Sequence, residues 1–191
     1  MIPRSSAVEK IPWQGELISV QPRIRLCRSF DERSHTYLGY ALRVRGSIGG
    51  EAREFLVGVG EGAHAKHGFR AGDTVSGVAL PVSDPRLETV EFYRVSDLRV
   101  SVREMEEETQ PPPWRGIPPP LSIYRERGHR RLAARTFEDK CTTCMWGCHM
   151  AVEMIIDQWN PETEPRHSAT ALFLVLSTDP DRLARFLAVA A

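Results

Sequence analysis

Apolar and polar residues alternate through much of the first 100 positions, and a period of two indicates β-strands with one buried face. Five runs carry this pattern: Ile24 and Leu26; Leu38, Tyr40, Leu42 and Val44; Phe55, Val57 and Val59; the run Thr74 to Val82; and Leu98, Val100 and Val102 within Val90 to Val102. The sequence therefore predicts five strands within residues 14–103.

Turns and one interruption separate these runs. Ser47 to Gly50 supplies a hairpin turn, and Gly72-Asp73 opens the fourth strand. Glu61 to Gly68 breaks the alternation and predicts a short helix or loop. Three strands, a short helical connection and two further strands are the order of the OB-fold, and an SH3-like barrel is the competing architecture. We expect an α+β protein with an OB-like five-stranded β-barrel over residues 14–103.

An acidic and proline-rich stretch follows the barrel region. Four glutamates precede Gln110 to Pro120, which holds six prolines. Proline fixes φ and lacks an amide proton, so residues 104–120 are predicted to form an extended linker. The other predicted units are the barrel (14–103), a small helical cysteine-cluster module (121–161) and a tail (162–191), with a short helix at 179–191. As an alternative, Pro111 to Pro120 is a polyproline ligand for the aromatic-lined groove of another protein.

The predicted barrel carries basic residues on its outer face. If Leu38, Tyr40, Leu42 and Val44 face the core, their neighbours point outward, and the outward set is Arg23, Arg25, Tyr37, Arg43 and Arg45. Guanidinium groups bind phosphates and an aromatic ring stacks on bases, so this set predicts a site for single-stranded nucleic acid. The alternative is the ordinary charged solvent face of an antiparallel sheet.

Three of the four cysteines, Cys141, Cys144 and Cys148, lie within eight residues of each other. On a helix this spacing forms one face, and an apolar stripe continues through Val152, Ile155, Ile156 and Trp159. Gly147 predicts a turn just before that helix. The C-x-x-C pair can present two thiolates to one metal, and Cys148 at a helix N-terminus would be favoured as a thiolate. We expect a metal or cluster site; the alternative is a buried helix in which cysteine acts as a small apolar residue.

The identity of the metal depends on the fourth ligand. Structural zinc takes four Cys or His ligands, so a Cys3His zinc site is the main prediction. His149 adjoins Cys148 and neighbouring residues seldom reach one ion together, so His129 or His167 is the predicted fourth ligand. Cys27 belongs to the barrel and is expected to be an unrelated thiol. An iron-sulfur cluster with one non-cysteine ligand is the alternative cofactor.

The cysteine region also resembles a known family. The chain resembles a family of uncharacterised bacterial proteins in three places: the run Tyr124 to Leu132 (YRERGHRRL), Phe137, and the segment Lys140 to Pro161. That family shares an RGHR box and the pattern C-x2-C-x-W-G-C-x-M-x-V-E-M-I-I-D-x-W-N-P, with an OB-like N-terminal region as a weaker match. The resemblance implies further cysteines after the N-P that complete a metal site. This chain departs from the family after Pro161, where residues 162–191 contain no cysteine.

Composition and missing motifs narrow the function. The 191 residues carry 25 basic and 25 acidic side chains, and the longest apolar run, Ala171 to Leu176, is far shorter than the roughly 20 residues of a membrane span. The N-terminus lacks the apolar stretch of a secretory signal, so we expect a cytoplasmic protein with reduced thiols. No G-x-S-x-G, phosphate-binding glycine loop or H-E-x-x-H is present. The sequence favours a zinc-containing, non-catalytic binding protein, most plausibly for single-stranded nucleic acid; the alternatives are an iron-sulfur redox or sensor protein and a protein-protein adaptor.

Overall fold

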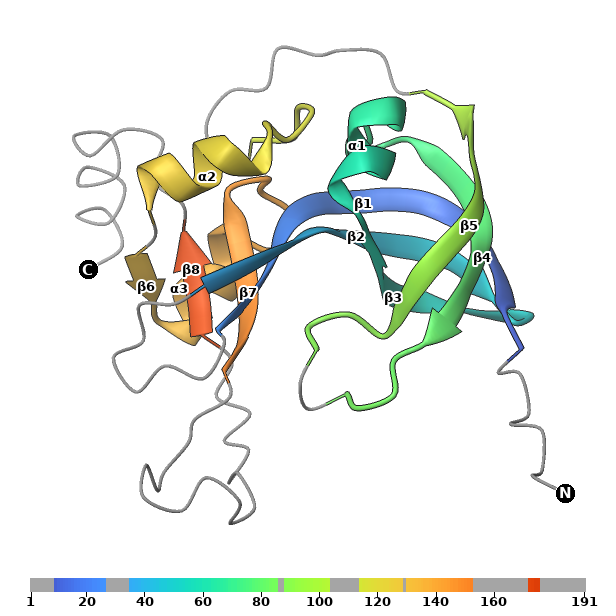
Figure 1. Ribbon diagram of the computed structural model, residues 1–191, viewed down its shortest axis with the longest axis horizontal. Helices are drawn as coiled ribbons and strands as arrows, with labels where there is room; N and C mark the ends of the chain where they lie inside the picture. Colours follow the sequence, from blue (N-terminus) through green and yellow to red (C-terminus); the bar gives the residue numbers. More distant parts are fainter. Residues whose placement is uncertain are drawn as a thin grey trace, which may run out of the picture.

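The computed structural model describes residues 9–26, 35–85, 88–103, 114–128, 130–152 and 172–175 (Figure 1). Its strands are β1 (Ile11–Leu26), β2 (His35–Ile48), β3 (Glu51–Val59), β4 (Thr74–Pro81), β5 (Phe92–Val102), β6 (Arg130–Leu132), β7 (Gly147–Val152) and β8 (Leu172–Val175). Its helices are α1 (Glu61–His67), α2 (Leu121–Arg127) and α3 (Ala134–Lys140). The expected short helix at Glu61 to Gly68 is confirmed, and it ends at Gly68, whose φ of 58° suits glycine.

The first five strands close into a mixed β-barrel, which confirms the predicted α+β class and five-stranded barrel. β1 pairs with both β2 and β4, β2 pairs with β3, and β4 pairs with β5, all antiparallel. A parallel pairing of Val57 with Phe92 joins β3 to β5 and closes the ring. The order around the barrel is therefore β1-β2-β3-β5-β4, with α1 between β3 and β4 in the chain.

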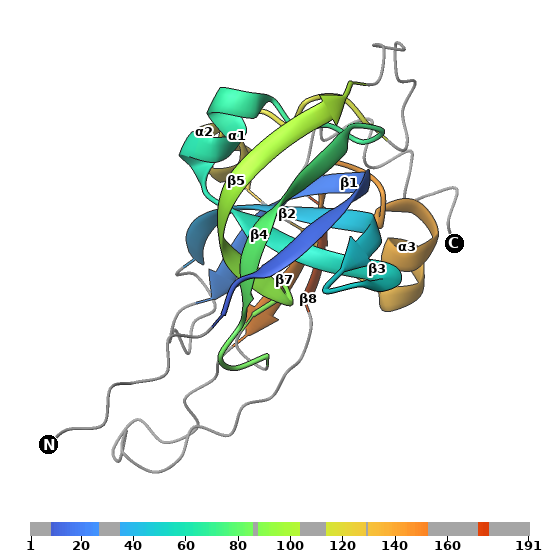
Figure 2. The same cartoon turned by 90° about the vertical axis from the view of Figure 1, so that its right-hand side faces the viewer.

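Bulges on β5 bend this strand around the barrel. Arg94 and Asp97 have φ values of 51° and 56°, and the register with β4 shifts beside each of them. An extra residue on one strand raises the local right-handed twist, so both bulges turn β5 towards β3. Figure 2 shows β5 curving across the barrel beside β4. The closure of the barrel thus depends on two residues that a period of two does not reveal.

The barrel interior holds many of the alternating apolar residues that the sequence singled out, although Val102 of the fifth run is 60% exposed. Buried side chains come from every barrel strand and include Trp13, Leu17, Val20, Ile24, Tyr40, Leu42, Val44, Ile48, Phe55, Val57, Val59, Val75, Ala79 and Phe92. Removal of one such large side chain from water contributes about 1.5–3 kcal/mol of favourable free energy. The hydrophobic effect therefore fixes which face of each strand points inward.

The alternation on β2 changes phase near its beginning. Arg23 pairs with Gly39, but the next residue of β1, Ile24, pairs with Tyr37, so Leu38 is an extra residue. Gly39 has a φ of 120°, and a Cβ atom there would overlap the carbonyl oxygen of Val59. After this bulge Tyr37 packs against the core. The expectation that Tyr37 faces outward is therefore wrong, because strict alternation does not hold across a bulge.

The cysteine region packs directly on the barrel. Ala151 and Val152 of β7 pair in parallel with Arg25 and Leu26 of β1, and β7, β8 and β6 extend the sheet in that order. Figure 1 shows β6, β7 and β8 together at one end of the barrel. One core cluster includes barrel residues and the C-terminal residues Leu121, Tyr124, Cys144, Trp146, Cys148 and Met150.

Two expectations about helices in this region are wrong. Residues 147–152, predicted to begin a helix at Cys148, form strand β7, because an apolar run of this length suits a strand that pairs with β1 on its edge. Residues 130–132, within the module predicted to be helical, form strand β6, and α3 begins at Ala134. The expected continuation of the stripe through Ile155, Ile156 and Trp159, and the helix at 179–191, lie outside the described residues.

The second half of the predicted linker lies against the barrel. Residues 114–120 contain no helix or strand, as expected for a proline-rich stretch. The carbonyl oxygen of Pro119 accepts a hydrogen bond of 2.7 Å from the Tyr40 hydroxyl, and that of Pro118 lies 3.0 Å from Nε2 of the buried His64. The Tyr40 and His64 rings are 3.9 Å apart, and burial lowers the pKa of His64. Pro118 is buried, so this half of the linker is part of the folded structure.

The helices of the described residues are short. None of them is long and apolar enough to cross a membrane.

Candidate cysteine site and barrel surfaces

The C-x-x-C sequence forms a turn between α3 and β7. Thr142 Oγ1 donates hydrogen bonds to the carbonyl oxygens of Phe137 and Glu138, which satisfies carbonyls at the end of α3. The Cys144 amide donates to the Cys141 carbonyl at 3.2 Å, and the Gly147 amide donates to the Cys144 carbonyl at 2.9 Å. Two consecutive tight turns thus place two sulfur atoms on the same short loop.

The sulfur of Cys144 is surrounded by backbone amides. The Trp146 amide donates to Cys144 Sγ at 3.4 Å. The backbone amides of Trp114 and Gly147 also favour the ionised form of this sulfur and lower its pKa. Trp114 is held in place in turn, since its carbonyl oxygen accepts a 2.9 Å hydrogen bond from the Met145 amide. The linker and the cysteine turn therefore build the environment of Cys144 together.

Gln21 of β1 connects the barrel to this turn. Its Nε2 atom lies 2.7 Å from the Cys141 carbonyl oxygen, 2.9 Å from that of Cys144 and 3.2 Å from that of Thr142. The side chain is buried, as are two of these three contacts. A single amide group thus gives the Cys141 and Cys144 carbonyls a second donor, in addition to the backbone amides of the turn.

Cys148 has a different environment. It lies on β7, is fully buried, and its thiol donates a 3.3 Å hydrogen bond to the carbonyl oxygen of Pro22 on β1. Burial raises its pKa to about 12, opposed by a hydrogen bond from the Ile24 amide. The expected thiolate at a helix N-terminus is therefore wrong, because Cys148 sits on a strand in the core rather than at a helix end.

The other two thiols are also protonated at neutral pH in the absence of a metal. Burial raises the pKa of Cys141 to about 12, with a further increase from nearby Cys144. Burial also raises the pKa of Cys144, against the effect of the surrounding amides. Reactive cysteines have a low pKa and partial exposure, so the geometry does not suit an exposed redox pair.

The predicted ligands are only partly described. Cys141, Cys144 and Cys148 all lie in the same buried region, and the charge of Cys144 acts on Cys141. Across the residues that the structure describes, no group of three or more His, Cys, Asp or Glu side chains is close enough to hold one metal ion. His129, His167 and Cys27 lie outside the described residues, so the predicted fourth ligand remains a prediction.

The predicted nucleic-acid residues do not form one face. Arg23 and Arg25 both pair with Glu88, and Arg23 is almost buried. Arg43 and Arg45 both pair with Glu54, at 3.9 Å and 2.8 Å. Tyr37 lies under the guanidinium of Arg125, whose carbon is 4.9 Å from the ring centre. The expected single neighbourhood of arginines is therefore divided by bulges and by acidic partners, although their role as nucleic-acid contacts remains a prediction.

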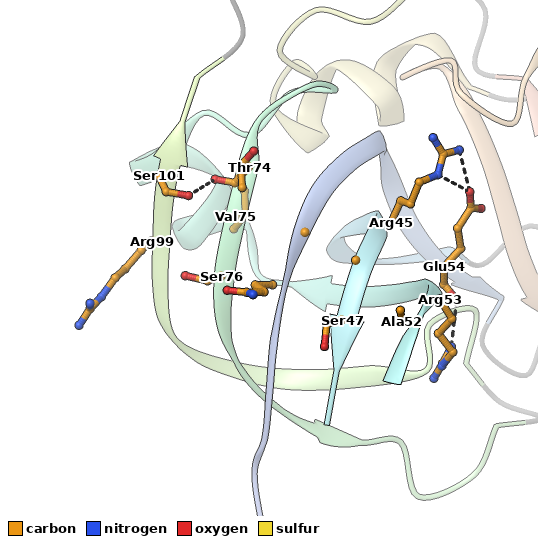
Figure 3. Close-up of a pocket in the computed structure, with 13 residues that line it drawn as sticks. Arg45, Ser47, Ala52, Arg53, Glu54, Thr74, Val75, Ser76, Arg99 and Ser101 are labelled. Atoms are coloured by element: carbon orange, nitrogen blue, oxygen red, sulfur yellow. Dashed lines mark hydrogen bonds and ion pairs between the residues drawn. The ribbon is translucent and has the colours of Figure 1, made fainter. Parts of the chain in front are cut away.

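A large open trough crosses the outer surface of the barrel (Figure 3). It has a volume of about 1030 Å³ and is lined by Gln14, Gly15, Arg45, Gly46, Ser47, Ala52, Arg53, Glu54, Thr74, Val75, Ser76, Arg99 and Ser101. Its small residues leave room between the arginines. Figure 3 shows Arg99 extending away from the strands into open space. The lining holds three arginines, one glutamate and several hydroxyl groups, so positive groups outnumber negative ones on it.

A second, more enclosed cavity lies between the barrel and the cysteine region. It has a volume of about 260 Å³ and is lined by Gln21, Pro22, Ala41, Arg43, Leu56, Thr89, Phe137, Glu138, Thr142 and His149. Figure 2 shows α3 on the same side of the barrel as β3, consistent with this lining. Burial and the charge of Arg43 lower the pKa of His149, so its imidazole is neutral at physiological pH.

Several of these residues were not singled out from the sequence. Gln21, Glu54 and Glu88 appeared as ordinary polar positions on exposed faces, and no local pattern marks their partners, which are 9 to 123 residues away. Arg99 was visible as the polar residue between Leu98 and Val100, but nothing in the sequence indicated that it lines the same trough as Arg45. The pairing of β1 with both β2 and β4, and of β4 with β5, places these two arginines on one trough.

Comparison of the chain with models of protein families, with curated protein sequences and with solved structures found no match.

Proposed function

We propose that this protein is a non-catalytic binding protein in which the cysteine turn holds a structural zinc ion. The observation that carries this proposal is the buried Cys144 Sγ, which accepts a hydrogen bond from the Trp146 amide and whose ionised form the Trp114 and Gly147 amides also favour. A neutral thiol is a weak hydrogen-bond acceptor, whereas a thiolate accepts several amide protons well. Three donors around a buried sulfur therefore favour an ionised sulfur, which needs a nearby positive charge.

Zinc supplies that charge and allows buried thiols with a raised pKa to ionise. Burial raises the pKa of Cys141 to about 12, so this thiol does not ionise by itself at neutral pH. A metal ion deprotonates the thiols that bind it, because the metal-sulfur bond replaces the proton. Cys141 and Cys144 provide two ligands, and Cys148 provides a third when its hydrogen bond to Pro22 is exchanged for the metal. His129 or His167 completes the proposed Cys3His set.

Metal analysis of the purified full-length protein tests this proposal. We expect about one zinc per chain in the wild type, and less than about 0.2 in Cys144→Ser, because a serine hydroxyl is a poor zinc ligand. Val102→Ser, at an exposed position, is the matched control and keeps its zinc. A colourless protein supports zinc, whereas absorption near about 400 nm after anaerobic purification supports an iron-sulfur cluster instead. A folded protein without any bound metal would falsify both.

We further propose that the barrel is OB-like and binds single-stranded nucleic acid along the trough. The closed order β1-β2-β3-β5-β4 with a helix after β3 supports the OB-like assignment. Arg45, Arg53 and Arg99 bring positive charge to one open surface, and the hydroxyl groups between them can donate to phosphate oxygens. No aromatic side chain lines this surface, so phosphate contacts rather than base stacking would supply the affinity. Arg45 is the residue shared with the set predicted from sequence.

Fluorescence anisotropy with a labelled single-stranded oligonucleotide tests the trough. We expect Arg99→Glu to weaken binding about 3- to 10-fold and to lower the slope of log affinity against log salt by about 1, because it removes one phosphate contact. Arg135→Glu makes the same charge change on α3, at an exposed position outside the trough, and should have a much smaller effect. Equal losses in both variants would indicate a general charge effect and would reject the trough as the binding surface.

A further inference from the structure

The enclosed cavity between the barrel and the cysteine region has features of a second binding site. Its walls come from separate parts of the chain: Ala41 and Arg43 on β2, Leu56 on β3, Glu138 on α3 and His149 on β7. Its volume of about 260 Å³ is close to the lower end of the range for small-molecule pockets. Protein interiors are otherwise close-packed, so an unfilled cavity between the barrel and the cysteine region leaves space for a ligand.

Of the residues that the structure describes, Arg43 is the one arginine or lysine that lines this cavity. Its Nε atom is buried and has no hydrogen-bond partner among the described residues. Its ion pair with Glu54 joins Nη1 to Oε2 at 3.9 Å, beyond hydrogen-bond distance. A buried guanidinium N–H without an acceptor is unfavourable, so an oxygen atom from a ligand would find a donor already in place.

The other polar groups of the lining indicate where a ligand can bind. The Gln21 amide and the Thr142 hydroxyl already donate to backbone carbonyls. The Thr89 hydroxyl and the His149 ring line the same cavity as Arg43. Ala41, Leu56, Pro22 and Phe137 supply an apolar wall. Glu138 also lines the cavity and repels an anion from its side, so a negative group would sit beside Arg43.

We propose that this cavity binds the oxyanion group, phosphate or carboxylate, of a small organic molecule, with Arg43 as the principal contact. The planar guanidinium matches the geometry of both oxyanions, and the apolar wall accommodates the uncharged part of the ligand. This proposal depends neither on the zinc ion nor on the trough, because Arg43 does not line the trough and no cysteine lines the cavity.

Isothermal titration calorimetry of the full-length protein tests the proposal with inorganic phosphate, a nucleoside 5′-monophosphate and acetate as probes, at about 0.15 M salt to screen surface charge. We expect saturable binding of at least one probe. Arg43→Gln should weaken this binding at least about 10-fold, because a charged hydrogen-bond donor is lost. Arg135→Gln is the control, since Arg135 is exposed on α3 and lines neither the cavity nor the trough, and its effect should be below about 2-fold.

A second variant keeps the test decisive if Arg43→Gln does not fold. Ala41→Leu fills the cavity without removing a charge, and it should abolish binding of the nucleoside monophosphate while the circular dichroism spectrum stays unchanged. Binding of phosphate probes but not acetate assigns the ligand to the phosphate class, and the converse assigns it to the carboxylate class. The proposal is rejected if no probe binds at up to about 10 mM, if Arg135→Gln weakens binding as much as Arg43→Gln, or if Ala41→Leu leaves binding unchanged.

Discussion

Replacement of Tyr124 by alanine is expected to lower the free energy of unfolding by about 4 kcal/mol. Tyr124 on α2 is fully buried in the core cluster that joins the barrel to the C-terminal region. Its ring meets that of Trp146 edge to face, with centres 5.1 Å apart, and its hydroxyl donates a 2.9 Å hydrogen bond to the Met145 carbonyl oxygen. Alanine removes both contacts and leaves a cavity. Because small domains are stable by about 5–15 kcal/mol, the variant should be close to unfolding.

Guanidinium denaturation followed by tryptophan fluorescence measures this change. Tyr124→Phe keeps the ring and loses the hydrogen bond to Met145, so its cost should be about 1 kcal/mol. Ser122→Ala, at an exposed position on the same helix, should change stability by less than about 0.5 kcal/mol. If Tyr124→Ala costs less than about 1.5 kcal/mol, α2 is not integrated with the barrel in the way that the core cluster indicates.

The barrel could be predicted from the sequence because burial on one face of a strand imposes a period of two. Leu42, Val44 and Val57 lie in the core, as their alternation indicated. The pattern failed where the backbone departs from a regular ladder. The bulge at Leu38 reversed the expected orientation of Tyr37, and nothing in the spacing of the apolar residues marks that bulge. Gly39 was the available signal, since its positive φ and its close approach to Val59 exclude other residues.

The cysteine region could be located but its structure could not be derived. The spacing of Cys141, Cys144 and Cys148 suits one face of a helix, and it equally suits a turn followed by a strand. A distant element favours the turn and strand over the helix, because the edge of β1 offers hydrogen-bond partners to β7. The spacing of the cysteines gives no information about the edge of β1. Gly147 did indicate a turn before Cys148, and a Cβ atom at this position would overlap the Cys141 carbonyl oxygen.

The surroundings of the arginines also depend on distant parts of the chain. Arg43 and Arg45 were expected to face outward together, and both do contact Glu54 on the neighbouring strand. They nevertheless belong to different surfaces, because Arg43 lines the enclosed cavity and Arg45 lines the trough. The C-terminal region causes this separation by covering the face of β2 near Arg43. Sequence alternation predicts which side of a strand a residue occupies, whereas the surface that it joins depends on what packs over that side.

Replacement of Gln21 by leucine is expected to lower the free energy of unfolding by about 2 kcal/mol, although leucine has a similar volume. The Gln21 amide satisfies the carbonyl oxygens of Cys141 and Cys144 at 2.7 and 2.9 Å, in a buried setting. Leucine removes the Gln21 donor from both oxygens, which keep the backbone amides of Cys144 and Gly147, and each lost hydrogen bond contributes about 0.5–1.5 kcal/mol. Gln14→Leu is the matched control, because Gln14 is exposed on the same strand and its substitution should change stability by less than about 0.5 kcal/mol.

Gln21→Glu separates loss of the hydrogen bonds from loss of packing. The introduced carboxylate would face the Cys141 and Cys144 carbonyl oxygens, so burial and repulsion raise its pKa above that of an exposed glutamate. A raised pKa in the folded state means that the folded protein binds the proton more tightly than the unfolded chain. This variant should therefore be least stable relative to wild type at neutral pH and should regain stability as the pH falls towards about 4.3, the ordinary pKa of glutamate. Denaturation curves at several pH values measure the difference. If the deficit of Gln21→Glu is independent of pH, or if Gln21→Leu matches Gln14→Leu, the amide of Gln21 does not hold the cysteine turn on the barrel.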